Sequence, residues 1–421
     1  MKIIFYVVMV ILTSFFFFPF EFTFSPGVNT KMMLAVVGGI IFFWSAVFTG
    51  KVVIPQIVFV ATFIACIFSF TVFYAIYYSN TNDYSYTAYV VSMLVWLIAA
   101  YAVCYLISRI HGYISVKLVI NYLIAVCVAQ CILALLIDKI LAVQRFFEIF
   151  VAYDVKAMEK FDRLYGVGAM LDVAGTRFSA VLVMIAMLLF NDNAVKSNKK
   201  TITVYVCMFV VITVVGSMIS RTTNIGMLVA FGYLIYASRI WAIQVKSINL
   251  RVWGVVITVM FFIVLICTFL YKNVAAANEL LRFAFEGFFN WIETGEWKTH
   301  STDILKSMWV YPETFKTWII GDGYFLDPIS NAFYMTTDVG YLRFIFYCGI
   351  QGLAVFSAFF IYLSIACYKI FPQERQLFVL LLIIVFAVWA KVATDIFLVY
   401  ALFICIPMVQ EHIKPRKWVV Q

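Results

Sequence analysis

Residues 57–76 read IVFVATFIACIFSFTVFYAI, a run without a single Asp, Glu, Lys or Arg. A helix of about 20 apolar residues is long enough to cross the roughly 30 Å hydrocarbon core of a bilayer. Similar runs recur along the chain, of which 65% is hydrophobic and 12% charged, with a mean hydropathy of +1.02. Backbone polar groups in lipid must be paired within their own segment, so these runs predict helices. The short alternating strands of a membrane barrel are absent from the sequence.

The apolar runs predict an all-α polytopic membrane protein with about twelve transmembrane helices, in a single integral membrane domain over residues 1–421. The first span begins with Met1-Lys2 and resembles a signal peptide. It lacks a small-residue cleavage site, so we interpret it as an uncleaved anchor. The expected spans are residues 3–20, 32–50, 52–77, 86–107, 118–137, 176–191, 201–220, 223–240, 252–271, 339–369, 376–391 and 394–410.

Charge sets the predicted orientation, since cytoplasmic loops of membrane proteins are enriched in Lys and Arg. The connections that contain Lys196 and Arg239, and the tail from Lys414, are basic and poor in acids. Placing them inside puts both chain termini in the cytoplasm. The net charge of +9 is then mostly a signal of topology, and it gives no reason to expect a nucleic-acid partner.

Two of the connections predicted to lie outside are long, at residues 138–175 and 272–338. Loops of this length in a compact fold are usually functional. The first contains apolar residues that suit a helix in the membrane interface. The second suits several short helices, with Pro312 in the first turn of one and a Gly-Asp-Gly turn at residues 321–323. We therefore expect a small helical cap over the membrane surface.

Arginines in the outer connections are the strongest functional signal. Lys and Arg are normally sparse on that side of a membrane, and a guanidinium group binds phosphate through two parallel hydrogen bonds. A phosphate-bearing or otherwise acidic substrate at the outer face is therefore predicted. Structural roles are the alternatives: Arg221 could anchor the membrane edge, and Arg163 and Arg177 could pair with nearby acids. The six arginines are Arg145, Arg163, Arg177, Arg221, Arg282 and Arg343.

Several motifs in these connections resemble a known family. They are Arg163-Leu164-Tyr165-Gly166, Gly175-Thr176-Arg177-Phe178-Ser179, Ser220-Arg221-Thr222-Thr223, Gly321-Asp322-Gly323-Tyr324 and Thr337-Asp338-Val339-Gly340-Tyr341-Leu342-Arg343, followed by Gly349 and Gly352. In their order and their shared outer location they resemble the O-antigen polymerase family, which is Wzy-like and belongs to the O-antigen ligase/polymerase superfamily. The resemblance covers roughly residues 160–370 and the number of spans.

The resemblance implies a glycosyltransferase of a bacterial cytoplasmic membrane, which polymerises undecaprenyl-pyrophosphate-linked oligosaccharide repeat units at the outer face. Cations would hold the leaving pyrophosphate, and Asp338 would take the acceptor proton, with His300 as the second candidate base. No cofactor is expected, and the mechanism is expected to be metal-independent. Expected partners are the lipid-linked oligosaccharides, membrane lipids, and flippase and chain-length regulator proteins. The expected substrate ligands are Arg163, Arg177, Arg221, Arg282, Arg343 and Tyr341.

Other interpretations stay open at this point. The related ligase branch carries a His where Asp338 stands, which weakens a ligase assignment. A flippase or other transporter would need charged groups at the bilayer midplane, which is almost charge-free here. Asp338 could instead cap the following helix, Arg343 could mark the interface, and His300 could be a surface residue. Lys391 and Asp395, four residues apart, are expected to form an ion pair with each other.

Overall fold

The computed structural model describes residues 2–49, 54–152, 163–238, 247–296, 298–330 and 332–413. Its regular structure is helical, and within these ranges β-pairing is limited to three isolated bridges. An all-α fold is thus confirmed. Each of the twelve predicted spans coincides with a helix, although these helices are not all of transmembrane length.

Eight of the twelve helices are long and apolar enough to cross a membrane. They are α2 (Thr30–Thr49), α3 (Gln56–Ser79), α4 (Tyr89–His111), α5 (Val116–Lys139), α8 (Leu171–Asn191), α10 (Lys199–Ile219), α12 (Ser247–Asn273) and α17 (Gly340–Ile370). Four more are shorter apolar helices: α1 (Lys2–Phe17), α11 (Thr223–Ser238), α18 (Arg375–Trp389) and α19 (Phe397–Ile413). The prediction of a polytopic membrane protein is confirmed at this level.

Helix α8 forms the centre of the bundle. Its most apolar window is 94% buried, because α5, α10, α11 and α18 pack around it. A second tightly packed region joins α17 to α3 and α18, where Phe356 stacks on Phe68 and on Trp389 with ring centroids 4.5 and 5.3 Å apart. Such aromatic pairs add about 0.5–1.5 kcal/mol each to the effect of burial alone. Because α18 contacts both regions, it links them into one body.

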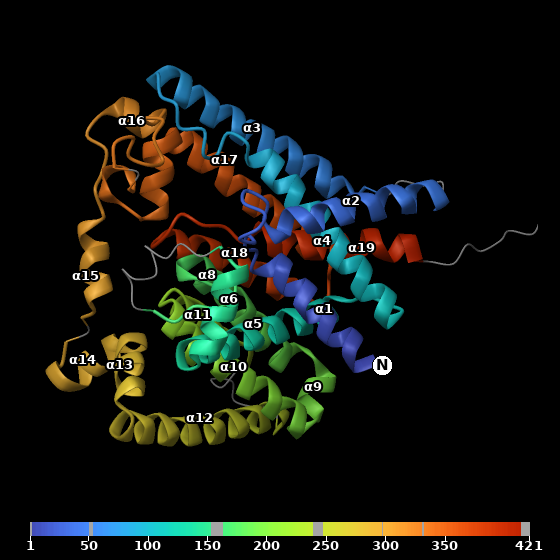
Figure 1. The fold of residues 1–421 in the computed structure, drawn as a ribbon, viewed down its shortest axis with the longest axis vertical. Helices are drawn as coiled ribbons and strands as arrows, with labels where there is room; N and C mark the ends of the chain where they lie inside the picture. Colours follow the sequence, from blue (N-terminus) through green and yellow to red (C-terminus); the bar gives the residue numbers. More distant parts are fainter. Residues whose placement is uncertain are drawn as a thin grey trace, which may run out of the picture.

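Helix α12 lies at the edge of the bundle, along the bottom of Figure 1. It packs against α10 and against α13 (Ala275–Ala284), and only 17% of its apolar window is buried. Its other side exposes Phe261, Phe262 and Phe269. A helix that is apolar on every side and little buried is suited to contact with lipid.

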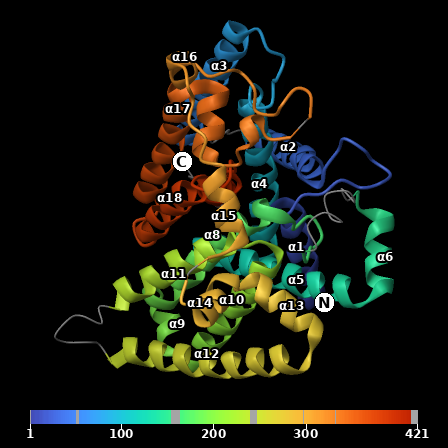
Figure 2. The same ribbon diagram turned by 90° about the vertical axis from the view of Figure 1, so that its left-hand side faces the viewer.

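The second long connection continues from α13 into α14 (Glu286–Thr294), α15 (His300–Ser307), α16 (Phe315–Ile319) and the 3₁₀ turn η1 (Tyr334–Thr336). These short helices pass along the left side of the molecule in Figure 1, away from the N-terminus. In Figure 2, which views that side face-on, α15 crosses the middle of the face. The first long connection contains α6 (Leu141–Phe150), which is tied to the α1–α2 connection where Thr23 Oγ1 donates to the Ile149 carbonyl at 2.6 Å. Short helices in both long connections were predicted and are confirmed.

Pro312 does not lie in a helix, so that prediction was wrong. Helix α16 begins later, at Phe315, because the Thr314 hydroxyl accepts the Thr317 N–H and caps the helix. The Pro312 carbonyl instead accepts a hydrogen bond from Trp318 Nε1 at 2.9 Å.

The predicted Gly-Asp-Gly turn joins the second long connection to α17. Gly321 and Gly323 have φ angles of +90° and +72°, which only glycine adopts readily. The turn pairs with the first part of α17, since the Asp322 N–H donates to the Phe346 carbonyl at 2.6 Å. Helix α17 breaks next to it at Gly349, where an added Cβ would lie 2.0 Å from the Ile319 carbonyl oxygen. This close contact fixes the connection onto the start of α17.

Candidate functional site

The polar side chains at this end of the bundle are organised around Asp172, in the first turn of α8. Its Oδ1 atom accepts hydrogen bonds from Ser220 Oγ at 2.8 Å, from the Thr222 hydroxyl, and from Lys391 Nζ at 2.9 Å. Lys391 Nζ also donates to Thr222 Oγ1 at 2.6 Å. Asp172 therefore joins the start of α8 to the α10–α11 turn and to the α18–α19 connection.

The α10–α11 turn presents Arg221 toward α14. Arg221 Nη2 lies 2.7 Å from Oε2 of Glu286, and Arg221 Nε donates to the Phe283 carbonyl at 3.0 Å. The guanidinium carbon lies 4.2 Å from the centre of the Phe283 ring, and that of Arg163 lies 5.2 Å from the same ring. The guanidinium groups of two arginines thus lie against the same aromatic ring, next to one carboxylate. The face of an aromatic ring attracts cations, so the ring stabilises both charges.

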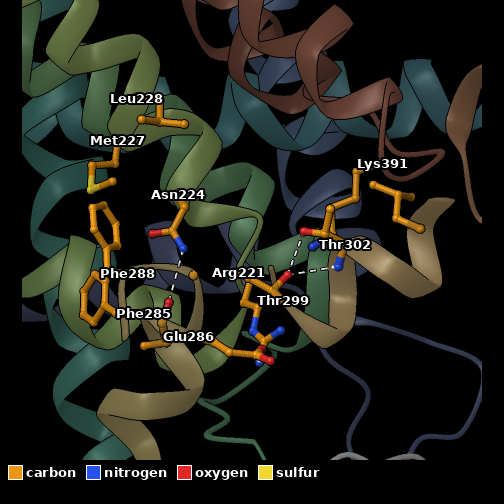
Figure 3. Close-up of a pocket in the computed structure, with 13 residues that line it drawn as sticks. Arg221, Asn224, Met227, Leu228, Phe285, Glu286, Phe288, Thr299, Thr302 and Lys391 are labelled. Carbon is orange, nitrogen blue, oxygen red and sulfur yellow. Dashed lines mark hydrogen bonds and ion pairs between the residues drawn. The ribbon is translucent and has the colours of Figure 1, made fainter. Parts of the chain in front are cut away.

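A pocket of about 220 Å³ opens beside Arg221 (Figure 3). The α10–α11 hairpin, α14, α15 and the α18–α19 connection all contribute to its walls. Two cations, one carboxylate and several hydroxyl and amide groups suit an anionic ligand that also accepts neutral hydrogen bonds. Its polar lining residues are Arg221, Asn224, Glu286, Thr299, Thr302 and Lys391.

An apolar groove of about 620 Å³ adjoins this pocket. Side chains of α10, α11, α12, α13 and α14 line it, and nearly all of them are hydrophobic. Four residues line both the groove and the pocket: Met227, Leu228, Phe285 and Phe288. A ligand with a charged head and a long apolar chain would therefore find both parts of its binding site next to each other.

Asp338 lies just before α17, paired with Arg343. Asp338 Oδ1 is 3.3 Å from Arg343 Nη1, while Arg343 Nη2 donates to the Phe325 carbonyl at 3.1 Å. The rings of Phe325 and Phe333 lie against the guanidinium, at 3.7 and 4.4 Å from its carbon. Burial raises the pKa of Asp338 to about 7; Arg343 opposes that rise, and the charge of Asp172 adds to it. A carboxyl with this pKa can accept a proton near neutral pH.

Asp338 lies close to the connection that carries Lys391, since a Cβ added at the neighbouring Gly340 would lie 2.7 Å from the Val392 carbonyl oxygen. The charges of Asp172 and Lys391 both act on Asp338. Thr337 Oγ1 donates to the Met308 carbonyl at 2.6 Å, so the residue before Asp338 is fixed to the end of α15. The first turn of α15 lines the Arg221 pocket. A proton acceptor and a cation-lined pocket therefore occur together at one end of the bundle.

Several predicted site residues are found in this region: Arg163, Arg221, Arg343 and Asp338. Asp338 does not cap α17, which was the structural alternative for this residue. The N-cap of α17 is Val339, and the Asp338 carboxylate accepts from Arg343 instead of a helix N–H. Tyr341 also lies on α17, but its hydroxyl donates to the Phe386 carbonyl at 2.7 Å and its ring packs on Trp389. These contacts give Tyr341 a part in joining α17 to α18.

The other predicted residues have different surroundings. Arg282 is exposed and binds Glu293 through two hydrogen bonds of 3.1 and 2.7 Å. His300 is exposed at the start of α15, where its backbone N–H donates to Glu286 Oε1 at 2.9 Å. Arg145 is exposed on α6. Arg177 is buried on α8, away from the Arg221 pocket, with its guanidinium against the rings of Phe18 and Trp96.

The predicted ion pair between Lys391 and Asp395 is wrong. Helix α18 ends at Trp389 and α19 begins at Phe397, so the two residues lie on a non-helical connection and share no helix face. Lys391 pairs with Asp172, whereas Asp395 Oδ1 accepts the Phe397 N–H at 2.8 Å.

The sequence motifs missed three members of the site, namely Asp172, Glu286 and Lys391. Asp172 falls between two of the quoted motifs, and Glu286 stands in a segment with no motif at all. One signal was available: a single charged residue at the end of an apolar span usually needs a partner. Asp172 and Lys391 both fit that description, but their pairing links residues 219 positions apart.

Among the described residues, no group of three or more His, Cys, Asp or Glu side chains is arranged to hold a metal ion.

No known protein family, curated protein or solved structure matches this chain.

Proposed function

We propose that the chain is a glycosyltransferase that polymerises oligosaccharide repeat units carried on undecaprenyl pyrophosphate, at the outer face of a bacterial cytoplasmic membrane. The observation that carries this proposal is the position of Asp338. Its pKa is raised to about 7 by burial, and it lies near the cation-lined pocket at one end of an apolar helix bundle. Transfer of a sugar from a pyrophosphate needs a proton acceptor and cations for the leaving group, and both are present in this region.

In the proposed reaction, the oxygen of an acceptor hydroxyl attacks the anomeric carbon of the donor sugar. The new carbon–oxygen bond forms as the bond from that carbon to the pyrophosphate oxygen breaks. The electron pair of the broken bond leaves with the pyrophosphate, whose charge Arg163, Arg221 and Lys391 stabilise. Asp338, deprotonated beforehand, takes the hydroxyl proton. Atoms and charges balance without any further reactant.

The apolar groove supports a lipid-borne donor. It meets the pocket at Met227, Leu228, Phe285 and Phe288, so a pyrophosphate near Arg221 would have its polyprenyl chain beside the groove. Water-soluble nucleotide sugars would have no use for such a groove. Flippase and chain-length regulator proteins are the partners that this reaction implies, because its substrates must be delivered and its product length set.

A ligase-type transfer is the second candidate, since it uses the same donor and differs only in the acceptor. A flippase is favoured less, because the charged groups gather at one end of the bundle and not at its middle.

The test is the glycan profile of cells that carry Asp338→Asn, a nearly isosteric change. Long-chain glycan should disappear and single repeat units should remain on the cell surface, because a positioned base contributes about 10²–10⁴-fold in rate. Polymer that is made but left on its lipid carrier would instead indicate a ligase. Normal long-chain glycan at normal protein level would contradict the role of Asp338.

A further inference from the structure

Arg177 is a buried cation outside the Arg221 pocket. It lies on α8 about one and a half turns beyond Asp172, and only 7% of its surface is exposed. Asp172 contacts the α10–α11 turn, whereas the guanidinium carbon of Arg177 lies 5.6 Å from the centre of the Phe18 ring and 5.8 Å from that of Trp96. The two side chains therefore leave α8 toward different neighbours, and Arg177 faces α1 and α4.

This cation has no direct counterion within the described part of the chain. Arg177 forms no ion pair there, and its buried Nε has no hydrogen-bond partner. Its interactions are with the faces of two aromatic rings. A buried charge without a direct ion pair is unfavourable, and a guanidinium group does not escape the cost by losing its proton. The charge of Asp395 acts on Arg177 and offsets only part of this cost.

A second cation lies against the same aromatic ring. Lys31, in the first turn of α2, places Nζ 4.5 Å from the centre of the Trp96 ring. The charges of Lys31 and Arg177 act on each other and on Asp395. Asp395 forms an ion pair with neither of them, and its Oδ1 accepts the Phe397 N–H. Two cations thus share one carboxylate that forms a direct ion pair with neither of them, and an added anion would balance the remaining positive charge.

We propose that Arg177 and Lys31 form a second anion site, which binds a phosphate group carried by a lipid. A planar guanidinium beside an ammonium is suited to phosphate oxygens. Lys31 begins α2, a helix with only 17% of its apolar window buried and a side exposing Val36, Ile40 and Phe43. A lipid that lies along α2 would bring its phosphate to the end of the helix, where the half-buried Lys31 and Arg177 lie against the same Trp96 ring.

The identity of the lipid follows if the proposed function is accepted, and this step rests on it. A polymerase joins two glycans that are both attached to lipid pyrophosphates. The Arg221 pocket would hold the pyrophosphate of the donor, and the Arg177 site would hold that of the acceptor. A membrane phospholipid offers the same phosphate chemistry, so the experiment must separate these two sources.

The experiment is native mass spectrometry of the purified protein in non-ionic detergent, titrated with undecaprenyl pyrophosphate and, separately, with phosphatidylglycerol. Wild type should bind two undecaprenyl pyrophosphates. Arg177→Gln and Lys31→Gln should each weaken one of them by about 10–100-fold, the expected effect of losing charge-assisted hydrogen bonds, and leave the other unchanged. Arg221→Gln should weaken only the other one. Arg145→Gln, which removes an exposed arginine of α6, is the matched control and should change neither.

Each outcome decides a separate point. Phosphatidylglycerol binding that depends on Arg177 and Lys31, with no such dependence for undecaprenyl pyrophosphate, would keep the anion site and overturn its assignment to a carrier lipid. Lipid binding that neither variant changes would overturn the site itself. Should Arg177→Gln fail to fold, Lys31→Gln alone decides, because Lys31 is only half-buried at the start of its helix. Undecaprenyl pyrophosphate binding that depends on Arg177 and Lys31 but is unchanged in Arg221→Gln would count against the proposed function and leave the Arg177 site intact.

Discussion

Two opposing effects act on the pKa of the Asp338 carboxyl group. Burial favours the neutral acid, whereas Arg343 at 3.3 Å favours the carboxylate, and burial is the larger effect, with a resulting pKa of about 7. The sequence placed Asp338 and Arg343 five residues apart, at the start of one span, so their proximity could be predicted. The raised pKa could not, because it depends on how deeply the fold buries the carboxyl group and on the charge of Asp172, which comes from a distant part of the chain.

The pKa of Asp338 predicts a pH dependence. In the proposed reaction Asp338 must be deprotonated, so the polymerisation rate should fall as the pH drops below about 7, approaching tenfold per pH unit. Initial rates of the purified enzyme between about pH 5.5 and 8.5 would measure this, with the low residual rate of Asp338→Asn as the control. Arg343→Gln removes the opposing cation and should move the midpoint to higher pH. A wild-type rate that is constant through pH 7 would contradict the assignment.

The raised pKa of Asp338 also makes the free energy of unfolding depend on pH. This dependence runs in the opposite direction to that of the rate. The folded-state pKa of Asp338 lies above the ordinary value of 3.8, so this group contributes stability below about pH 4 and loses it as the pH rises through 7. The proton acceptor that the proposed function requires at neutral pH is therefore accompanied by a lower stability than the folded protein has in acid.

Asp172 is predicted to stabilise the turn that carries Arg221. Its carboxylate accepts hydrogen bonds from Ser220, Thr222 and Lys391, so Asp172→Asn would leave the partly buried Lys391 ammonium without its counterion. We expect the free energy of unfolding to fall by roughly 1–3 kcal/mol. Thermal unfolding in detergent would measure the change.

A double-mutant cycle with Lys391→Met supplies the control. If the pair interacts as described, the double variant should be more stable than the sum of the two single changes implies. Additive effects would mean that the Asp172–Lys391 pair contributes nothing of its own.

At the scale of whole elements, sequence patterns located each of the twelve apolar helices, eight of which are long enough to span a membrane, because hydrophobicity is a local property. The positions of twelve helices were predictable from apolar runs alone. Their neighbours were not: nothing in the apolar run of α8 indicates that it lies at the centre while α12 lies at the edge. The groove between α11 and α12 is likewise a product of packing, since residues of α10, α13 and α14 also line it.

The groove predicts a dependence on the length of the donor lipid. Ile263→Trp would place an indole in the groove from α12 and displace about two methylene groups of a bound chain, at about 0.8 kcal/mol each. The KM for an undecaprenyl-linked donor should then rise by roughly tenfold. A donor with a short prenyl chain should be affected much less. Steady-state rates with the two donors would measure the difference.

Phe261→Trp is the matched control for this prediction. It places an indole on the same helix, on the side that is exposed in the structure, and should leave both KM values unchanged. Equal effects of the two substitutions on both donors would mean that the groove does not hold the chain.

At the scale of the whole molecule, the candidate site belongs to one end of the bundle. Helix α8 runs from Asp172 in the site to Asn191, and its 21 residues span about 30 Å. Asp192 beyond it pairs with Lys117 at 2.6 Å, among basic connections such as Lys196 to Lys200. The two ends thus differ in composition. The composition could be predicted from the sequence. The sequence could not predict which connections bring residues to the candidate site, because that depends on how the helices pack.

The orientation of the molecule in the membrane gives the last prediction. Because the connections near Lys196 are basic and poor in acids, that end should face the cytoplasm and the Asp338 end should face outward. In a variant with the nine native cysteines replaced, Ile329→Cys on the exposed loop near Phe333 and Glu148→Cys on α6 should react with a membrane-impermeant thiol reagent in intact cells. Asn193→Cys, at the opposite end, should react only after lysis. The reverse pattern would place Asp338 and the Arg221 pocket on the cytoplasmic side, where nucleotide-activated donors are available, and a lipid-pyrophosphate donor would lose its main justification.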